Sequence, residues 1–443
     1  MCADFDPRRV PINRHRLIVR HPTRTREIGV EPSGALPRFD SDDRHTADVD
    51  HINDEMLSRY GVRTTVLRSL LHGEVRDGVV ERAHEIEVHG DAGDALVWRP
   101  AGSFEPVDGA DGAALEAWRA PFAITNGCAW MAPGWFSGVV EWIGAALRRT
   151  GRRTPSAIRQ LRSWQSSCVL RVDYGDETAY FKALPAGGPE YAMTRWLAGE
   201  FPQHAAPLIA ADGAHRWLLL GACAGRSLEE VADVAAWAAA VRRYGGLQLA
   251  CAERTDELRR AGCATRSLQS LPAAVAALAN DAAMLHAGLD GLTEAEFAGL
   301  RSIVPAVATR CGELAAIGIP DSLEHGDLWP GNVFVDGDAS AIIDWEDVAI
   351  AHPFLSIAPL IVGLGNAGLA TPANVAELEQ GYARAFESIA PASRIRRAID
   401  LAAPLCFLDM ALRYRAERGS VARLHPWMRD LVPQTVRLAL ARL

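Results

Sequence analysis

The stretch LEHGDLWPGNVFV, at residues 323–335, constrains the fold of this chain more than any other part of its sequence. It places Asp327 and Asn332 five residues apart, directly before an apolar run, and a second apolar run ends at Asp344. We expect the segments NVFVD and SAIID to form the two arms of a hairpin, with a turn at DGDA. Such a hairpin brings Asn332 near Asp344, although twelve residues separate them, and leaves Asp327 at the loop mouth facing the same space.

Two carboxylates and a carboxamide in this arrangement suit phosphoryl transfer. That reaction needs metal ions to neutralise developing charge, a cation to hold the nucleotide phosphates and a carboxylate to orient the acceptor hydroxyl. Mg²⁺ prefers oxygen ligands and keeps several waters, so one carboxylate and one carboxamide suffice on the protein side. The residue types and their spacing therefore favour a magnesium-nucleotide site in this part of the chain.

The composition is ordinary for a soluble globular protein. Of 443 residues, 49% are hydrophobic and 23% are charged, and the formal net charge is −9. This modest acidity gives no electrostatic reason to expect nucleic acid or an anionic membrane as a partner. No segment has the roughly 18 unbroken apolar residues that span a bilayer. The eight cysteines are scattered singly without a CxxC pair, and with no recognisable signal peptide we expect free thiols and a cytoplasmic location.

The first 150 residues indicate an α+β domain. One helix-like segment at 48–61 lies among strand-like runs at 16–21, 26–34, 64–73, 80–90 and 95–100. This order resembles a Nudix domain, whose helix carries paired glutamates that hold metal for pyrophosphate hydrolysis. Glu55 matches one acidic position, but Ser58 and Arg59 stand where that family has its two metal-binding glutamates. We therefore expect a non-catalytic domain over residues 1–150, the alternative being a plain β-rich capping or substrate-shaping domain.

A second domain follows the boundary that GRRTP, at residues 151–155, indicates. Its first strands, CVLRVDY and TAYFKAL, are joined by a tight turn and predict a hairpin. A helix that begins at Pro189 comes next, and from Leu228 onward the chain is mostly helical. We expect this domain to span residues 156–443, with a β-rich lobe over about 156–226 and a helical lobe over about 227–443.

HGDLWPGN followed by IIDWED resembles the aminoglycoside phosphotransferase and choline kinase family of small-molecule kinases. The family pattern, HGDxxxxN followed by a hydrophobic strand and Ile-Asp, is matched by His325, Gly326, Asp327, Asn332, Ile343 and Asp344. The resemblance implies a bilobal, protein-kinase-like α+β fold for residues 156–443. It also implies that Asp327 orients or deprotonates the acceptor hydroxyl, that Asn332 and Asp344 bind Mg²⁺, and that His325 supports the loop.

The resemblance also implies an ATP site in the β-rich lobe. Lys182, in a chain with very few lysines, stands where the family places the lysine that reaches the α- and β-phosphates. Glu190 opens the following helix and would pair with Lys182. Glu200 is the competitor, but it lies at the C-terminal end of that helix, where a carboxylate opposes the helix dipole.

The remaining nucleotide contacts depart from the protein-kinase pattern. The turn SWQSSC lacks the glycines of a protein-kinase phosphate loop, which leaves Ser166 and Ser167 as the candidates to contact phosphate. Leu220 and Ala222, in LLLGACAG, are the candidates to present backbone groups to the adenine.

A second departure follows the IIDWED segment. The family continues with a proline and then an Asp-Leu-Ala step that anchors the next helix. This chain keeps Pro353 but has Ser356 near the aspartate position, which puts the local anchoring in doubt. Glu346 and Asp347 either add to the metal or substrate field or are solvated.

The predicted activity is ATP- and Mg²⁺-dependent transfer of the γ-phosphate to a hydroxyl of a small molecule, such as a sugar, an amino alcohol, an antibiotic or a related metabolite. The alternatives are a catalytically silent nucleotide-binding regulatory protein and a protein kinase, and the latter is disfavoured because no APE-like stretch follows IDWED. In the acceptor site, Asp409 and Trp427 either contact the substrate or serve packing. The sequence leaves open the acceptor, the choice between ATP and GTP, and the oligomeric state.

Overall fold

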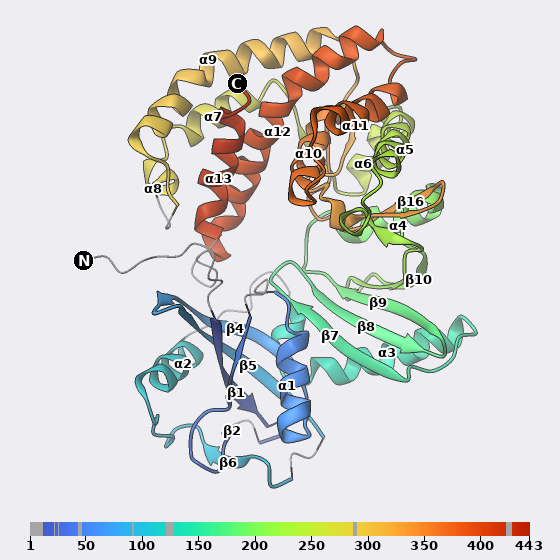
Figure 1. The fold of residues 1–443 in the computed structure, drawn as a ribbon. Coiled ribbons are helices and arrows are strands. Elements are labelled where there is room, and N and C mark those ends of the chain that lie inside the picture. The colour runs from blue at the N-terminus through green and yellow to red at the C-terminus, as the bar shows by residue number, and fades with distance from the viewer. Residues whose placement is uncertain are drawn as a thin grey trace. The chain divides into compact units, whose positions relative to one another are not determined.

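The computed structural model describes residues 12–21, 23–24, 26–42, 47–90, 93–120, 128–286, 290–421 and 428–443 (Figure 1). The chain forms two compact units, and each is described by itself. Unit 1 contains Met1–Gly187, Ile209–Leu220 and Arg423–Pro426, and unit 2 contains Gly188–Leu208, Gly221–Ala422 and Trp427–Leu443. Within the described residues, no helix has the length and apolar character needed to cross a membrane.

Unit 1 begins with a six-stranded sheet. Its strand order is β4-β5-β1-β2-β6, and β3 pairs with β1. The pairing of β1 with β5 is parallel, and the other pairings are antiparallel. The strands are β1 (Ile12–Arg20), β2 (Glu27–Val30), β3 (Arg38–Ser41), β4 (Arg63–Arg76), β5 (Val79–His89) and β6 (Val97–Pro100).

A helix covers each face of this sheet because side chains alternate between the two faces along a strand. Leu17 and Val19 of β1 share a core with α1 (Asp50–Tyr60), whereas Ile18 packs with α2 (Gly109–Arg119) on the other face. The helix α1 ends at Gly61, whose φ of +68° is the left-handed conformation that commonly terminates helices. The α+β character predicted for this part of the chain is confirmed.

The second sheet of unit 1 has the order β10-β11-β9-β8-β7. The hairpin predicted from CVLRVDY and TAYFKAL is present as β8 and β9. The helix α3 (Trp135–Arg149) packs on this sheet, and its buried Val139, Ile143 and Leu147 share one core with Leu170 and Phe181. The strands are β7 (Ala157–Ser163), β8 (Cys168–Tyr174), β9 (Glu177–Ala183), β10 (Leu208–Asp212) and β11 (Trp217–Gly221).

The two sheets of unit 1 are joined by a buried glutamine. Gln160 on β7 accepts a hydrogen bond from the backbone N–H of Val66 at 2.7 Å and donates one to its carbonyl at 2.9 Å. Asp48, just before α1, pairs with Arg162 of β7 at 2.9 Å. The first 150 residues and the strands after them therefore share one unit, while the predicted division at residues 151–155 stays a prediction.

Unit 2 is mainly helical, with two small sheets ordered β12-β15-β16 and β13-β17-β14. Its strands are β12 (Arg226–Ser227), β13 (Ala264–Arg266), β14 (Ser322–Glu324), β15 (Val333–Asp336), β16 (Ala339–Ile342) and β17 (Ala349–Ala351). Its helices are α4 (Glu190–Glu200), α5 (Val234–Ala252), α6 (Thr255–Arg260), α7 (Leu271–Leu278), α8 (Ala282–Leu285), α9 (Glu294–Ala316), α10 (Ile357–Asn366), α11 (Pro372–Ala385), α12 (Ala392–Val421) and α13 (Met428–Leu440). Short 3₁₀ turns in the chain are η1 (Ala129–Met131), η2 (Pro202–His204), η3 (Leu228–Glu230), η4 (Pro330–Asn332) and η5 (Pro353–Ser356).

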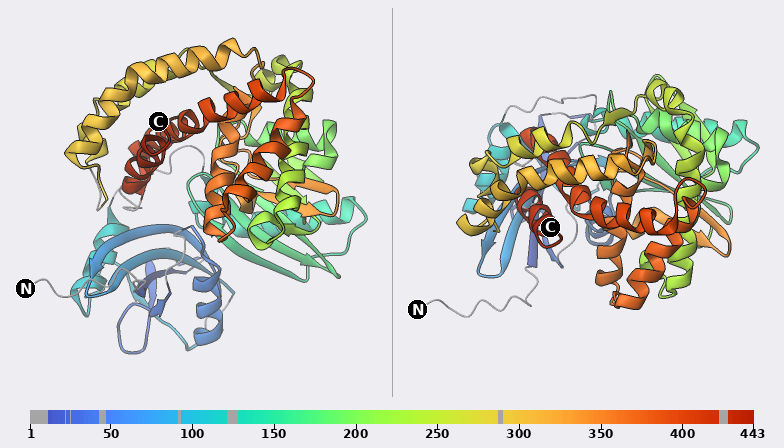
Figure 2. Two further views of the ribbon diagram at one scale, coloured as in Figure 1. Left: turned by 45° about the horizontal axis from the view of Figure 1, so that its top comes forward. Right: turned by 90° about the horizontal axis from the view of Figure 1, so that it is seen from above.

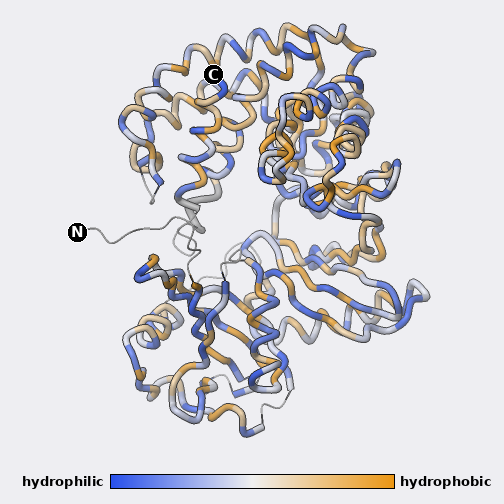
Figure 3. The backbone as a smooth tube through the Cα atoms, viewed as in Figure 1, coloured by the Kyte–Doolittle hydropathy of each residue, from blue (hydrophilic) through white to orange (hydrophobic). Residues whose placement is uncertain are grey.

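The helices of unit 2 enclose one large apolar core. The helices α9, α12 and α13 pack against one another, as both views in Figure 2 show, and α5 packs along α11. Hydrophobic and hydrophilic residues alternate along these helices in Figure 3, in keeping with one buried and one exposed face. The seven described cysteines are free thiols, and all except the half-buried Cys223 are buried.

Candidate active site

The hairpin predicted around the DGDA turn is confirmed. Its arms are β15 and β16, with Val333 opposite Ile342. Just past that pair, the backbone N–H of Ile343 donates to the carbonyl of Asn332 at 3.0 Å, so the ladder reaches the residues that precede and follow the two strands. Asn332 and Asp344 consequently lie at the same end of the hairpin. The hairpin thereby brings Asn332 and Asp344 near each other, although twelve residues separate them in the sequence.

Asp344 has an unusual backbone conformation. Its φ of +67° lies in the left-handed region, which residues other than glycine rarely adopt. Backbone conformations of this kind persist only where the surrounding structure holds them, and they gather at functional sites. Because Asp344 directly follows the hairpin, the ladder beside it supplies that constraint.

Three carboxylates meet beside the hairpin. Asp344, Glu346 and Glu190 each offer an oxygen, and these oxygens all lie within 4.8 Å of one another. Glu190 opens α4 and is only 5% exposed. Like charges this close repel, and a bound divalent cation with oxygen ligands relieves that repulsion. The residues present therefore fit Mg²⁺.

The loop before the hairpin carries Asp327. Gly326 has a φ of +85°, and a β-carbon there would collide with the backbone of Asp347, so this position requires glycine. The carboxamide of Asn332 donates to the carbonyl of Asp327 at 2.9 Å and fixes the loop against the hairpin. Burial raises the pKa of the Asp327 carboxyl to about 6, which suits a group that accepts a proton near neutral pH.

His325 supports this loop from beneath. It is fully buried, and its Nε2 lies 2.9 Å from the carbonyl of Ile343, to which it donates. Its Nδ1 accepts the backbone N–H of Asp327 at 3.2 Å. Burial lowers the pKa of the imidazole, so the ring stays neutral and bridges two backbone segments. This geometry matches the structural role that the family resemblance implies for it.

The structure also answers the doubt raised by Ser356. The hydroxyl of Ser356 donates to the carboxylate of Glu324 at 2.9 Å, and the same oxygen of Glu324 accepts the backbone N–H of Gly326 at 2.9 Å. Tyr244 bridges the other side, since its hydroxyl lies 2.9 Å from that of Ser356 and accepts the N–H of His325 at 3.0 Å. The anchoring carboxylate is present, but it comes from Glu324 instead of from position 356.

Two arginines complete the support beneath the loop. Arg413, on α12, pairs with Asp347 at 2.5 Å and donates to the carbonyl of Gly326. Arg266, at the end of β13, pairs with Glu324 and donates to the carbonyl of Asp347 at 3.0 Å. Asp347 is therefore a half-buried structural partner of the two arginines, whereas Glu346 lies with the carboxylates of the proposed metal site.

The acceptor-site candidates have different outcomes. Asp409 is buried and lies 3.4 Å from both Arg266 and Arg413, so its contacts favour the structural interpretation over substrate recognition. Trp427 lies outside the described residues.

Lys182 lies in unit 1, on β9 opposite Val169 of β8, and is half-buried. It is the single lysine of the sequence, and the other 45 of the 46 lysine and arginine residues are arginines. Lys182 and Glu190 belong to different units, so their predicted pairing stays a prediction. Glu200, the competitor of Glu190, pairs with Arg254 at 2.8 Å.

The other nucleotide-site candidates lie on turns and strand ends. Ser166 and Ser167 are in the turn between β7 and β8, where the N–H of Trp164 donates to the carbonyl of Ser167 at 2.9 Å. Leu220 is the last residue of its segment of unit 1, and Ala222 lies in unit 2. The chain therefore passes from one unit to the other within the segment predicted to receive the adenine.

Sequence reasoning missed Glu324, Arg266 and Arg413. Glu324 left a signal, because a charged residue directly follows Leu323 in a strand and directly precedes His325. The arginines left none, since Arg413 meets Asp347 from 66 residues away in the sequence.

Residues 157–394 match the model of the family described as Phosphotransferase enzyme family. Solved structures similar to the chain include a choline/ethanolamine kinase family protein from Mesorhizobium loti, a spectinomycin phosphotransferase in complex with ADP and spectinomycin, and a choline kinase from Cryptosporidium parvum. Their sequences are 15%, 11% and 10% identical, with TM-scores of 0.46, 0.44 and 0.49. The matches cover 69% of this chain and 98%, 98% and 95% of the other chains. No protein of curated function matches the sequence.

Proposed function

The chain belongs to the phosphotransferase enzyme family, and on this premise we propose that it transfers the γ-phosphate of ATP to a hydroxyl of a small molecule, with Mg²⁺ as cofactor. Family membership makes it a small-molecule kinase, and together with its helices and sheets it confirms the predicted α+β, protein-kinase-like fold. The observation that carries the finer proposal is the hairpin, which holds Asn332 and Asp344 at one end next to the loop of Asp327.

Each residue of this site has a proposed task. Asp327, whose raised pKa suits proton transfer, orients the acceptor hydroxyl and takes its proton. Asn332 and Asp344 hold Mg²⁺, and Glu346 and Glu190 lie close enough to Asp344 to share in binding it. When bound, Mg²⁺ neutralises charge on the phosphate oxygens.

The ATP site is proposed from Lys182 together with Ser166, Ser167, Leu220 and Ala222. A chain that uses arginine for all its other strong bases keeps one lysine, on the strand where the family resemblance implies a phosphate ligand. Lysine offers a compact point charge on a flexible stem, which arginine does not reproduce.

For residues 1–150 we propose a Nudix-like domain without hydrolase chemistry. Glu55, the matching acidic residue, pairs with Arg59 at 3.0 Å, and Arg59 also donates to the carbonyl of Arg38. An arginine that occupies the place of a metal ligand and neutralises the neighbouring carboxylate does not hold a cation.

We place the reaction in the cytoplasm, where ATP and Mg²⁺ are available and free thiols stay reduced. The acceptor is proposed as a hydroxyl-bearing metabolite, sugar, amino alcohol or antibiotic. We do not assign Asp409 to the acceptor site, because its carboxylate already pairs with Arg266 and Arg413.

Labelling of the single lysine tests the nucleotide site. An amine-reactive ester modifies only Lys182 and the chain's N-terminal amine, so intact-mass spectrometry has at most two labels to follow. We expect MgATP to protect Lys182, and expect Asp344→Ala to remove the Mg²⁺ dependence of that protection. Lys182→Arg is the control that identifies the labelled site. Equal labelling of wild-type protein with and without MgATP would contradict the proposed site.

Release of ADP tests the transfer itself. Across a library of hydroxyl-bearing acceptors, we expect acceptor-dependent ADP release that falls by about 100-fold or more in Asp327→Ala, the range that loss of a general base costs. Asp338→Ala, in the exposed hairpin turn, is the matched control and should leave the rate unchanged. Protection of Lys182 by MgATP without turnover above Asp327→Ala would favour the silent nucleotide-binding alternative.

A further inference from the structure

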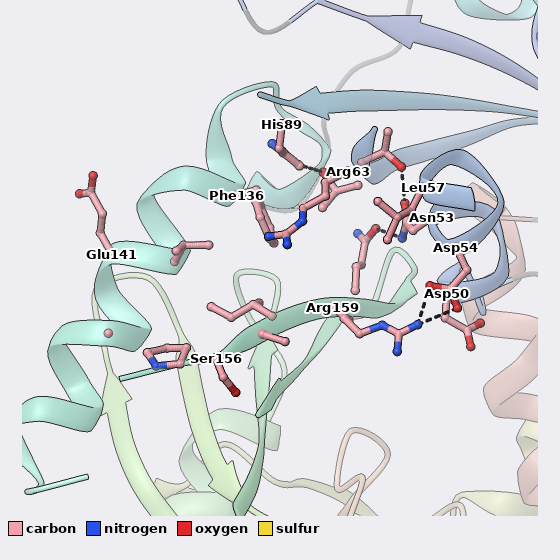
Figure 4. Close-up of a pocket in the computed structure, with 18 of the residues that line it drawn as sticks. Asp50, Asn53, Asp54, Leu57, Arg63, His89, Phe136, Glu141, Ser156 and Arg159 are labelled. Atoms are coloured by element: carbon pink, nitrogen blue, oxygen red, sulfur yellow. Dashed lines mark hydrogen bonds and ion pairs between the residues drawn. The ribbon is translucent and has the colours of Figure 1, made fainter. Parts of the chain in front are cut away.

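A cavity of about 1030 Å³ lies within unit 1 and shares no residue with the candidate active site (Figure 4). Its walls come from α1, the start of β4, the end of β5, α3 and residues 154–160. Ligand sites in proteins typically enclose roughly 300–1,000 Å³ and combine apolar walls with a few placed polar groups. The volume therefore suits a small molecule, and the chemistry of the lining side chains indicates which class of molecule binds.

The inner wall is held rigidly by buried hydrogen bonds. The hydroxyl of Thr64 donates to Asn53 at 3.0 Å, and the carboxamide of Asn53 donates to Gln160 at 3.3 Å. Gln160 is 3% exposed and is itself bonded to the backbone of Val66. The inner wall of the cavity is thus a built feature of the fold, since side-chain hydrogen bonds fix it to the backbone of Val66.

An aromatic stack forms a second wall. The rings of His89 and Phe136 lie 4.5 Å apart and are nearly parallel. Nε2 of His89 lies 2.9 Å from the hydroxyl of Thr65, and among the described residues no hydrogen bond reaches its Nδ1. Burial lowers the pKa of His89 to about 4, so the ring is neutral at physiological pH and offers Nδ1 to a ligand.

Three carboxylates and three arginines line the cavity, namely Asp50, Asp54, Glu141, Arg63, Arg148 and Arg159. On one side, the carboxylate of Asp54 is neutralised by Arg159 at 2.7 Å, as the dashed lines in Figure 4 show. Near the aromatic stack, Arg63 reaches toward Phe136, while Glu141 points away from the cavity (Figure 4). Within the described part of the chain, no carboxylate pairs with Arg63.

We infer that this cavity binds a small organic anion with an apolar, ring-containing body. The ring would pack on Phe136 and along the α3 wall at Val140 and Gly144, where the side chains are apolar or absent. The carboxylate or phosphate of the ligand would meet the guanidinium of Arg63 and accept a hydrogen bond from the Nδ1–H tautomer of neutral His89. Nothing in this site draws on the residues of the proposed phosphoryl transfer.

Three naphthalene probes test this inference on the full-length chain by isothermal titration calorimetry. They are 2-naphthoate, 2-naphthyl phosphate and the neutral 2-naphthalenemethanol, each titrated with and without saturating MgATP so that binding at a nucleotide site is recognised. We expect at least one anion to bind at millimolar or lower concentration, and the neutral alcohol to bind about tenfold more weakly, the cost of losing a charged hydrogen bond. The tighter anion identifies the ligand's acidic group as a carboxylate or a phosphate.

Two glycines of α3 provide matched variants. Gly144 lines the cavity, and a β-carbon there meets only the flexible end of Arg148, at 3.3 Å, so Gly144→Leu fills the cavity without a backbone clash. Gly138, on the same helix, has no atom within 4 Å of its β-carbon position and does not line the cavity, so Gly138→Leu is the control.

We expect Gly144→Leu and Arg63→Gln each to weaken anion binding by about tenfold or more, and Gly138→Leu to bind as the wild type does. Three results would overturn the inference. They are binding of neither anion at millimolar concentration, equal binding of the neutral alcohol, and unchanged binding in Gly144→Leu.

Discussion

Five charged side chains meet beneath the loop of Asp327, and their protonation follows from their neighbours. Burial alone would raise the pKa of Glu324, yet Arg266 and Arg413 hold it below its ordinary value. Burial would lower the pKa of Arg413, but the carboxylates around it raise it instead. Glu324 and Arg413 therefore favour each other's ionised form, so removing either one weakens the electrostatic balance of a buried cluster.

Glu324→Gln tests this dependence. The variant keeps the shape of the side chain but removes the charge that faces Arg266, and breaking a buried ion pair by removing one partner costs about 3 kcal/mol or more. We expect a clear fall in the free energy of unfolding, measured by chemical denaturation. Glu313→Gln is the control, because its pair with Arg397 is exposed and such pairs contribute less than about 1 kcal/mol. Equal losses in the two variants would contradict this account.

At the scale of elements, the contact between α5 and α11 depends on glycine. A β-carbon on Gly245 of α5 would lie 2.6 Å from the β-carbon of Ala385, and one on Gly381 of α11 would lie 2.5 Å from the carbonyl oxygen of Ala238. Both helices therefore approach more closely than alanine allows. Glycine lowers the intrinsic stability of each helix, and the packing of unit 2 offsets that cost.

Two adjacent glycines of α5 separate packing from helix propensity. Gly245→Ala should destabilise the protein by about 1–3 kcal/mol, because the added methyl group clashes with α11. Gly246→Ala has no atom within 4 Å of the new methyl group and should stabilise it by about 0.5–1 kcal/mol. The two variants are compared by thermal and chemical unfolding. If both shift stability in the same direction, close helix packing is not the reason for Gly245.

At the scale of the whole molecule, a single core extends across the boundary that the sequence indicates at residues 151–155. Val139, Ile143 and Leu147 of α3 precede that boundary, and they pack with Leu170 and Phe181 that follow it. One face of the strands that the family model matches is thus covered by residues that lie outside the match.

Truncation tests this shared core. A chain that begins at Ser156 lacks α3 and exposes the apolar face of β8 and β9, so we expect poor solubility and a lower melting temperature. A chain that begins at Cys128 keeps α3 and should be the more soluble and more stable of the two. The comparison uses the soluble yield and the melting temperature of each chain. Equal behaviour would show that the second sheet does not need α3.

Local patterns in the sequence were enough to predict most elements and the centre of the site. The alternation of apolar residues predicted most strands of unit 1, although not β3 or β7, and glycine at position 61 marked the end of α1. The DGDA turn between two apolar runs predicted the hairpin, which joins Asn332 to Asp344. These features depend on neighbours within about a dozen residues, and such information is present in the order of residues along the chain.

The sequence by itself therefore determined the family, the fold class and the group of Asp327, Asn332 and Asp344. Only the tertiary structure decided what supports them. Glu324 supplies the anchoring carboxylate that the family has near position 356. Arg413 pairs with Asp347, which lies 66 residues away in the sequence, and Asp409 pairs with Arg266 and Arg413. Motif reasoning likewise did not predict the cavity of unit 1, which residues between Asp50 and Gln160 line. Long-range packing creates these contacts, and no local pattern encodes which distant charges it brings together.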